Sequence, residues 1–181
     1  MAPEHAKMDV SAEPQPDVAP SDQVDCFSQM VKLGQEEELP EMDTINERLA
    51  TVEQRMGKSV REHLGFGLVS ASAIKVVDGD IGEFNEDNKL HGRGMNNYYN
   101  GIIGIGYYKD GECATGNYLE IWSDGNFEVG ECYLKDGKLC YRGTQYKTDG
   151  TTEEFDVWVI LFIKLNNINR VVQVELLAAP I

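Results

Sequence analysis

Four cysteines are the first candidates for reactive side chains in this sequence. They are Cys26, Cys113, Cys132 and Cys140. A cysteine that attacks a substrate, binds zinc or forms a structural disulfide usually has a partner at a defined spacing. None of the four belongs to a CxxC pair, and no motif places a His or Lys to activate one of them. The sequence therefore predicts reduced thiols, with no zinc site, no disulfide framework and no cysteine nucleophile.

The histidines and acidic residues form no stronger motif. His5, His63 and His91 belong to no HExxH or paired arrangement. Residues 78–89 begin like a calcium-binding loop, but the sixth position lacks the required glycine and the twelfth lacks the required glutamate. No P-loop, GxSxG motif or pair of catalytic carboxylates can be named. The sequence therefore predicts no metal, no cofactor, no catalytic residue and no enzymatic activity.

The charge of the chain disfavours two classes of partner. The sequence has 16 Lys and Arg against 31 Asp and Glu, a net charge of −15. A protein that binds nucleic acid or an anionic membrane directly needs a basic surface, so neither partner is expected. The longest apolar run, residues 157–163, is too short to span a membrane, and the acidic N-terminus resembles neither a secretory signal nor a transit peptide. We expect a cytoplasmic protein that reaches cytoskeleton or membrane only through a partner.

The N-terminal residues 1–43 are predicted to be a disordered acidic tail. Residues 1–44 carry a net charge of −9 and five of the six prolines. Such a segment cannot bury enough apolar surface to offset the entropy lost on ordering. The apolar residues between 26 and 33 leave a second interpretation open, a short helix or a docking peptide.

Residues 44–64 are predicted to form one amphipathic helix. Thr44 and Glu47 have the spacing of a capping box, and Gly65 follows as a stop signal. The apolar residues on one stripe are Ile45, Leu49, Val52, Met56 and Val60. This heptad spacing fits two structures. The helix packs on the β-domain of its own chain, or it pairs with a second copy in a coiled-coil dimer.

A repeat follows the helix. Gly82, Gly106 and Gly130 are spaced by 24 residues, and Gly92 and Gly116 each stand ten residues after the first two. We expect these to be turn glycines of the repeat. Asp-Gly dipeptides, which suit type I′ turns, begin at positions 78, 110, 124, 136 and 149, with alternating apolar and polar segments between them. The sequence predicts an antiparallel meander of short strands, with one hairpin per repeat.

The repeat resembles the MORN (membrane occupation and recognition nexus) family. Gly-Glu-Phe at 82–84 and Lys-Leu-His-Gly-Arg-Gly at 89–94 match it closely, and residues 130–143 match it moderately. The bacterial YwqK-like variant repeats are similar as well. The resemblance implies a mainly β fold of stacked β-hairpins in an elongated single sheet, preceded by one helix and the tail. It also implies a scaffold that holds another protein, often near cytoskeleton, cilia or membranes, without catalytic residues.

Aromatic side chains are abundant in and after the repeats, which we place at residues 65–155. Most are expected to form cross-strand pairs, and some are candidates for an exposed stripe that binds a partner helix or peptide. These candidates are Tyr107, Trp122, Phe127, Tyr133, Tyr146, Trp158 and Phe162.

Residues 156–181 are predicted to form an apolar closing β-hairpin. Its first strand, residues 157–163, is apolar on both faces, so each face must be covered. Two structures satisfy this requirement. Either the hairpin ends the array under the helix of residues 44–64, or it provides a dimer interface or docking strand.

Three functions are compatible with the sequence. The first is a non-enzymatic adaptor whose repeat sheet holds a helical or extended protein segment. The second is a structural subunit of a large cytoskeletal, ciliary or organellar assembly. The third is a regulatory fragment of an enzyme. The absence of any catalytic motif favours the first two.

Overall fold

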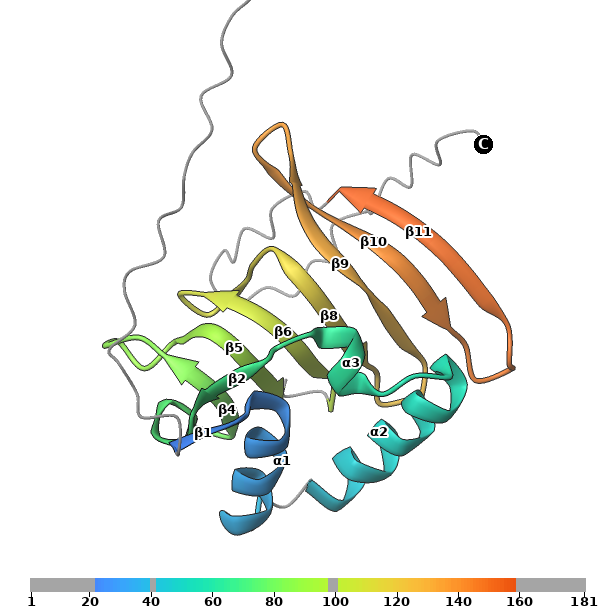
Figure 1. The fold of residues 1–181 in the computed structure, drawn as a ribbon. Helices are drawn as coiled ribbons and strands as arrows, with labels where there is room; N and C mark the ends of the chain where they lie inside the picture. The colour runs from blue at the N-terminus through green and yellow to red at the C-terminus, as the bar shows by residue number, and fades with distance from the viewer. Residues whose placement is uncertain (1–21, 40–41, 98–100, 159–181) are drawn as a thin grey trace, which may run out of the picture.

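The computed structural model describes residues 22–39, 42–97 and 101–158. The largest part of the fold is one antiparallel sheet. Its strands are β3 (Lys75–Val77), β4 (Asp80–Phe84), β5 (Leu90–Asn97), β6 (Ile103–Lys109), β7 (Glu112–Cys113), β8 (Gly116–Ile121), β9 (Phe127–Lys135), β10 (Lys138–Tyr146) and β11 (Thr152–Trp158). The order across the sheet is β11-β10-β9-β8-β6-β5-β4-β3, with β7 paired to β6 (Figure 1). The predicted mainly β meander is confirmed.

The hairpin turns have the chemistry that the sequence predicts. Asp78, Asp110 and Asp136 have φ of 51°, 55° and 52°, and each is followed by a glycine that also has a positive φ. Two successive positive φ values define a type I′ turn, whose twist matches that of the flanking strands. These three turns join β3 to β4, β6 to β7 and β9 to β10.

The repeat glycines differ from their predicted role, because they lie within strands rather than in turns. Gly82, Gly94 and Gly106 are Cα partners on β4, β5 and β6, and Gly130 faces Gly143 across β9 and β10. Each repeat of 24 residues therefore forms two strands. Each repeat also places a glycine in the same row across the sheet. We call Gly82, Gly94, Gly106, Gly130 and Gly143 the glycine row. At these positions the absence of a Cβ serves close packing, as argued below for Gly130.

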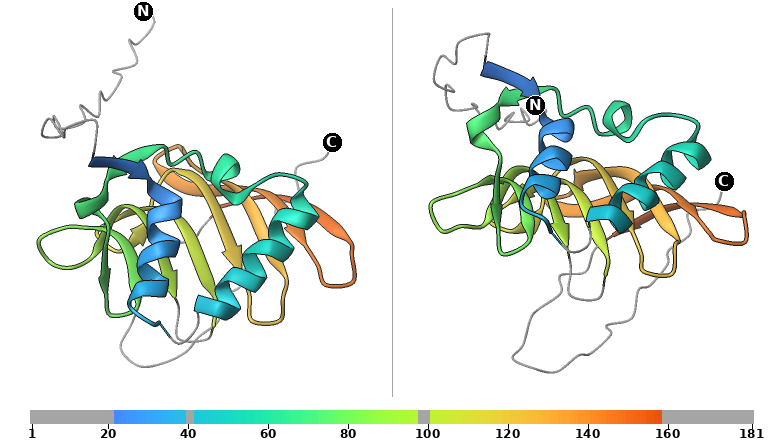
Figure 2. Two further views of the ribbon diagram at one scale, coloured as in Figure 1. Left: turned by 60° about the horizontal axis from the view of Figure 1, so that its bottom comes forward. Right: turned by 90° about the horizontal axis from the view of Figure 1, so that it is seen from below.

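Three helices and a short ribbon precede the sheet. They are β1 (Gln23–Asp25), α1 (Cys26–Glu36), α2 (Met42–Met56), α3 (Val60–Leu64), β2 (Leu68–Ser70) and the 3-10 turn η2 (Ala71–Ala73). Strands β1 and β2 pair with each other in a separate two-stranded sheet. Both views of Figure 2 show the helices on the same side of the large sheet.

Helix α1 lies inside the segment that was predicted to be a disordered tail. Asp25 caps its N-terminus by accepting a hydrogen bond from the Ser28 N–H at 2.9 Å. Cys26 and Met30 are fully buried and join the core against the sheet. Residues 26–36 therefore form the short helix of the alternative interpretation, because their apolar side chains pack on the core beside the sheet. Residues 1–21 lie outside the described residues.

The predicted helix of residues 44–64 is divided in two. Gly57 has a φ of 71° and donates its N–H to the Glu53 carbonyl, which ends α2. Ser59 then caps α3 through its hydroxyl, which accepts from the Glu62 N–H at 3.1 Å. The carboxylate of Glu53 also accepts from the Val60 N–H at 2.9 Å. A local left-handed residue therefore overrides the apolar periodicity that suggested one continuous helix.

The apolar stripe of α2 packs on the sheet. Ile45, Leu49 and Val52 are buried in a core that includes residues of β4, β5, β6, β8 and β9, and Met56 packs at its margin. The interpretation in which the helix packs on its own β-domain describes these residues, and their buried side chains are not available for a coiled-coil seam.

The last described strand, β11, pairs with β10 from Thr152 to Trp158. Residues 156–158 of the predicted closing hairpin therefore continue the meander. The rest of that prediction, residues 159–181, lies outside the described residues. No helix in the described ranges is long and apolar enough to cross a membrane.

Candidate functional site

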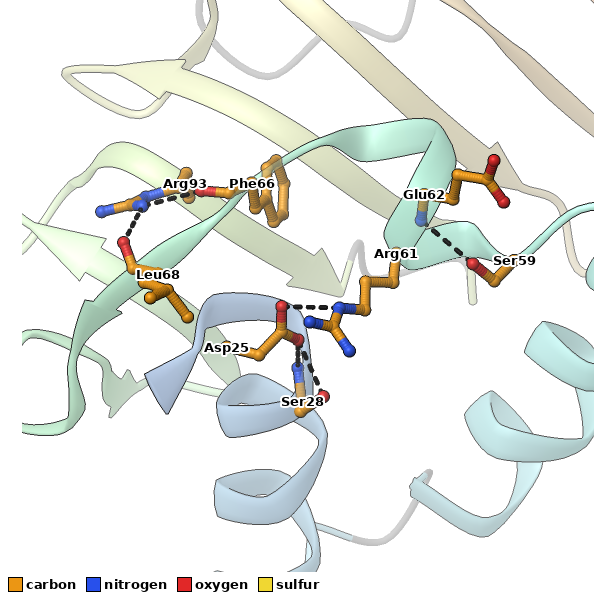
Figure 3. Close-up of polar contacts among 8 residues, drawn as sticks. All are labelled: Asp25, Ser28, Ser59, Arg61, Glu62, Phe66, Leu68 and Arg93. Carbon is orange, nitrogen blue, oxygen red and sulfur yellow. Dashed lines mark hydrogen bonds and ion pairs between the residues drawn. The ribbon is translucent and has the colours of Figure 1, made fainter. Parts of the chain in front are cut away.

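A surface cleft of about 440 Å³ lies between α1, α3 and β2. Its lining residues are Asp25, Ser59, Arg61, Glu62, Gly65, Gly67 and Leu68. The Asp25 carboxylate contacts Arg61 Nε at 2.8 Å and accepts from the Ser28 hydroxyl at 2.7 Å (Figure 3). Asp25 and Ser59 are occupied in capping helices and in the ion pair. The cleft is therefore a junction that fastens α1 to α3, with no arrangement of groups for catalysis.

Arg93 fastens the segment beside this cleft to the sheet. Its Nη1 donates to the carbonyl oxygens of Phe66 at 2.9 Å and Leu68 at 3.1 Å (Figure 3). Its Nε and Nη2 donate to the two carboxylate oxygens of Glu83 at 2.8 and 2.7 Å. Burial alone would raise the pKa of Glu83, but the hydrogen bonds from Arg93 outweigh burial and leave that pKa lowered. This bidentate pair belongs to the architecture rather than to a binding site.

The second candidate is the sheet face opposite the helices, which we call the outer face. Side chains alternate between the two faces of a strand, so each residue next to a core residue points to the outer face. Ile81, Leu119 and Val129 belong to the helix-covered core. The glycine row and the side chains of Tyr118, Glu120 and Glu128 therefore lie on the outer face. No element of the described ranges covers this face in Figure 2.

Two glutamates face each other on the outer face, next to the turn that joins β8 and β9. Glu120 on β8 and Glu128 on β9 are direct Cα partners, and both are half-buried. Burial raises the pKa of Glu120, and burial together with the charge of Glu120 raises the pKa of Glu128 to about 7. Neither carboxylate forms an ion pair within the described part of the chain. The pair therefore presents a negative charge that a cation would stabilise.

Two tyrosines border the glutamate pair. The hydroxyl of Tyr118 donates to Glu128 Oε1 at 2.9 Å, which opposes the rise in the Glu128 pKa. The rings of Tyr118 and Tyr141 meet edge to face with centroids 5.4 Å apart. The glycine row leaves room for such rings close to the sheet backbone. A Cβ on Gly106 would lie 3.2 Å from the Tyr118 Cβ.

Asp80 and Asn96 extend the polar part of the outer face toward β4. Asn96 donates its side-chain N–H to Asp80 Oδ2 at 2.9 Å, and the Asn97 N–H donates to Oδ1 at 3.1 Å. Burial raises the pKa of Asp80 despite these bonds. Asn96 Oδ1 is buried and has no hydrogen-bond partner among the described residues. A buried acceptor without a donor is costly, so this oxygen is a place where a donor from a ligand would be favourable.

Ionisation of Glu128 is expected to destabilise the fold as pH rises. A carboxyl whose pKa is about 7 in the fold and 4.5 when unfolded holds its proton more tightly when folded. The free energy of unfolding therefore falls between about pH 4.5 and pH 7. Glu128→Gln removes this penalty and should stabilise the protein by about 2 kcal/mol at pH 8 but not at pH 4. Thermal unfolding across this pH range measures the difference.

The control for Glu128→Gln is Glu154→Gln, which removes an exposed carboxylate from β11. It should leave the pH dependence of stability close to that of the parent protein. Equal pH profiles for parent and Glu128→Gln would show that Glu128 ionises in the fold as it does in water.

The aromatic residues predicted to bind a partner lie in different environments in the structure. Phe127 and Tyr146 stack with centroids 4.6 Å apart under α2, and Arg55 lies 5.0 Å above the Phe127 ring. Tyr107 meets Phe66 edge to face at 5.2 Å on the helix side of the sheet. These three rings pack inside the domain, and Phe127 is only 1% exposed. These three residues form aromatic contacts within the domain rather than an exposed stripe.

The other predicted aromatic residues do not gather on one surface. Tyr133 donates its hydroxyl to Asp156 at 2.5 Å, and the Arg142 guanidinium lies 4.9 Å from the centre of its ring. Trp122 is half-buried at the turn after β8. Trp158 ends β11, and Phe162 lies outside the described residues.

Sequence reasoning missed the glutamate pair. Glu120 and Glu128 are eight residues apart, on either side of the turn that begins at Asp124. Centring the β8–β9 hairpin on that turn would have brought them opposite each other. The sequence carries no sign, however, of which sheet face the helices leave uncovered.

The geometry of the described residues does not by itself identify a protein family. The described ranges contain no group of three or more His, Cys, Asp or Glu residues placed to hold a metal ion. The resemblance of the repeats to MORN proteins remains a prediction. The outer face is the candidate binding surface. No protein-family model, no curated protein and no solved structure matches this chain.

Proposed function

We propose that this protein is a non-enzymatic binding module whose outer face holds a helical or extended segment of a protein partner. The helices cover one face of the sheet, and the half-buried polar side chains of the other face, Glu120, Glu128 and Asn96, are the groups that a partner would contact. Tyr141, which is half-buried on this face, offers part of its ring to a partner.

The glutamate pair carries this proposal and specifies the partner's chemistry. Two facing carboxylates that are half-buried and lack a cation favour a segment that places a Lys or Arg between them. The unpartnered oxygen of Asn96 would accept a donor from the same segment. A basic side chain over the half-buried Tyr141 ring would also gain a cation–π contact.

Three further points are part of the same proposal. The first is that the hairpin repeats serve as a MORN-like scaffold. A role as adaptor in the cytoplasm, tethered to cytoskeleton or membrane through its partner, agrees with the net charge of −15, which disfavours direct contact with anionic lipid. The same negative charge favours a partner with basic residues.

Selection of peptides from a displayed library on the full chain tests the proposal. Enriched peptides should contain Lys or Arg among apolar residues. Their affinity, measured by fluorescence anisotropy, should fall at least about tenfold for the Glu120→Gln/Glu128→Gln double variant.

The matched control is Glu86→Gln/Glu154→Gln, which removes the same number of carboxylates from exposed positions. This control should retain affinity within about twofold, because the charge of a distant exposed residue is screened. Peptides without basic residues, or equal binding to both double variants, would contradict the proposed site.

A further inference from the structure

Two cysteines that are far apart in the sequence meet beside the outer face. Cys113 of β7 and Cys132 of β9 have their Sγ atoms 3.3 Å apart, although 19 residues separate them in the chain. Cys132 lies opposite Gly116, the first residue of β8, and Gly116 follows closely after β7. The chain turns back between β7 and β8 and so brings Cys113 over Cys132. At this distance the sulfurs are in contact and unbonded.

The two thiols differ in exposure and in acidity. Cys132 is only 1% exposed, whereas Cys113 is half-buried. Hydrogen bonding from Cys132, with a further contribution from Tyr141, lowers the pKa of Cys113 despite burial. The contact with Cys113 and burial raise the pKa of Cys132. A half-buried thiol with a lowered pKa therefore faces a more deeply buried thiol with a raised pKa, as in an attacking and resolving pair.

The remaining cysteines are placed differently. Cys26 is buried in α1 on the helix side of the sheet, and Cys140 is fully buried on β10. Cys140 is the Cα partner of Tyr133, whereas Cys132 is the partner of Tyr141, so Cys140 and Cys132 point to opposite faces. Within the described residues, Cys113 and Cys132 are the cysteines in contact.

We propose that Cys113 and Cys132 are a redox site that closes reversibly into a disulfide when a small-molecule disulfide oxidises it. The Cys113 thiolate attacks one sulfur of oxidised glutathione, forms a mixed disulfide and releases one glutathione thiolate. Cys132 then loses its proton and attacks Cys113 Sγ, which expels the second glutathione. The protein loses two hydrogens, and one glutathione disulfide is reduced to two thiols. This inference is independent of the proposed partner binding.

The closed bond would join β7 to β9 across the start of β8, at the end of the outer face beside Tyr141. Only a small approach of the sulfurs is needed, because they already touch and Cys113 lies in a two-residue strand at the margin of the sheet. Reduction by excess dithiol restores the two thiols by the reverse exchange.

Oxidation of the folded full chain with glutathione disulfide tests the site. After alkylation of the remaining thiols, peptide mapping by mass spectrometry should find Cys113 joined to Cys132, with Cys26 and Cys140 alkylated. The rate of closure should rise with pH as the thiolate of Cys113 forms, and should level off at a lower pH than for an ordinary cysteine. Dithiothreitol should return four alkylatable thiols.

Two variants make the result specific. Cys113→Ala should keep its remaining three thiols alkylatable after oxidation, and its half-exposed position tolerates the change. Cys140→Ala, which removes a buried thiol of the neighbouring strand, should still form the bond at the parent rate. Four alkylatable thiols in the folded parent protein after oxidation at pH 8, or a bond between any other two cysteines, would overturn the proposal.

Discussion

Replacing Arg93 with alanine is expected to lower the free energy of unfolding by about 3–5 kcal/mol. The side chains of Arg93 and Glu83 are only 13% and 17% exposed. The variant leaves the Glu83 carboxylate half-buried without its bidentate partner. It also removes the two hydrogen bonds that Arg93 Nη1 donates to the Phe66 and Leu68 carbonyls, which hold the start of β2 on the sheet. Chemical denaturation at pH 7 measures the loss.

The repeat itself provides the control for this experiment. Arg142 and Glu131 occupy the corresponding strands of the third repeat and form the same kind of pair, with contacts of 2.7 and 3.1 Å. Their side chains are 56% and 43% exposed, so water and salt screen the interaction. Arg142→Ala should leave the unfolding free energy almost unchanged. Similar losses for the two variants would mean that burial does not distinguish the pairs.

A Glu83→Gln variant separates charge from packing at the same site. The Arg93 hydrogen bonds hold the pKa of Glu83 below its ordinary value, against the effect of burial. A lowered carboxyl pKa contributes stability at neutral pH that is lost on acidification through the folded pKa. The stability difference between parent and Glu83→Gln should therefore be present at pH 7 and shrink as pH falls below 4.5, the ordinary pKa of the carboxyl.

Replacing Gly130 with alanine is expected to cost about 3 kcal/mol or more. An added Cβ would lie 2.1 Å from the Arg142 carbonyl oxygen and 3.0 Å from the Gly143 Cα. Both neighbours are backbone atoms of β10, so no side chain can move aside and the two strands must separate. The cost is steric, and it comes from the close approach of β9 and β10 at the glycine row. Thermal and denaturant unfolding would both show it.

Gly137 of the same hairpin is the matched control. No heavy atom lies within 4 Å of a Cβ built there, but its φ is +73°. Gly137→Ala should cost only the strain of a left-handed alanine, about 1 kcal/mol. If Gly130→Ala is no more destabilising than Gly137→Ala, the glycine row is not held by close backbone contact.

The turns and strands were predictable because their causes are local. Asp-Gly dipeptides adopt positive φ at low cost, and the structure has successive positive φ values at three of them. The burial of Ile45, Leu49 and Val52 follows from helical periodicity. The division of α2 from α3 was missed, since one glycine with a left-handed backbone outweighs a regular apolar pattern.

The candidate site was not predictable in the same way. Contact between Cys113 and Cys132 depends on the path of the chain between β7 and β9. The environment of Glu120 and Glu128 depends on the side of the sheet that the helices cover. Neither is a property of neighbouring residues, so no motif marks them. Three of the aromatic residues chosen as a partner stripe, Tyr107, Phe127 and Tyr146, pack in or against the core instead, because composition does not say which face of a strand meets the core.

The sequence by itself determined a mainly β chain of hairpins, its period of 24 residues, and a net charge that disfavours anionic partners. Dihedral preferences and side-chain alternation act over a few residues and need no tertiary context. Only the tertiary structure decided which sheet face lies under α1, α2 and α3. It also decided which glycines meet backbone to backbone, which arginine is buried with its glutamate, and which two thiols touch. These features arise from burial and from contacts between residues distant in the chain, and both depend on how the whole chain packs.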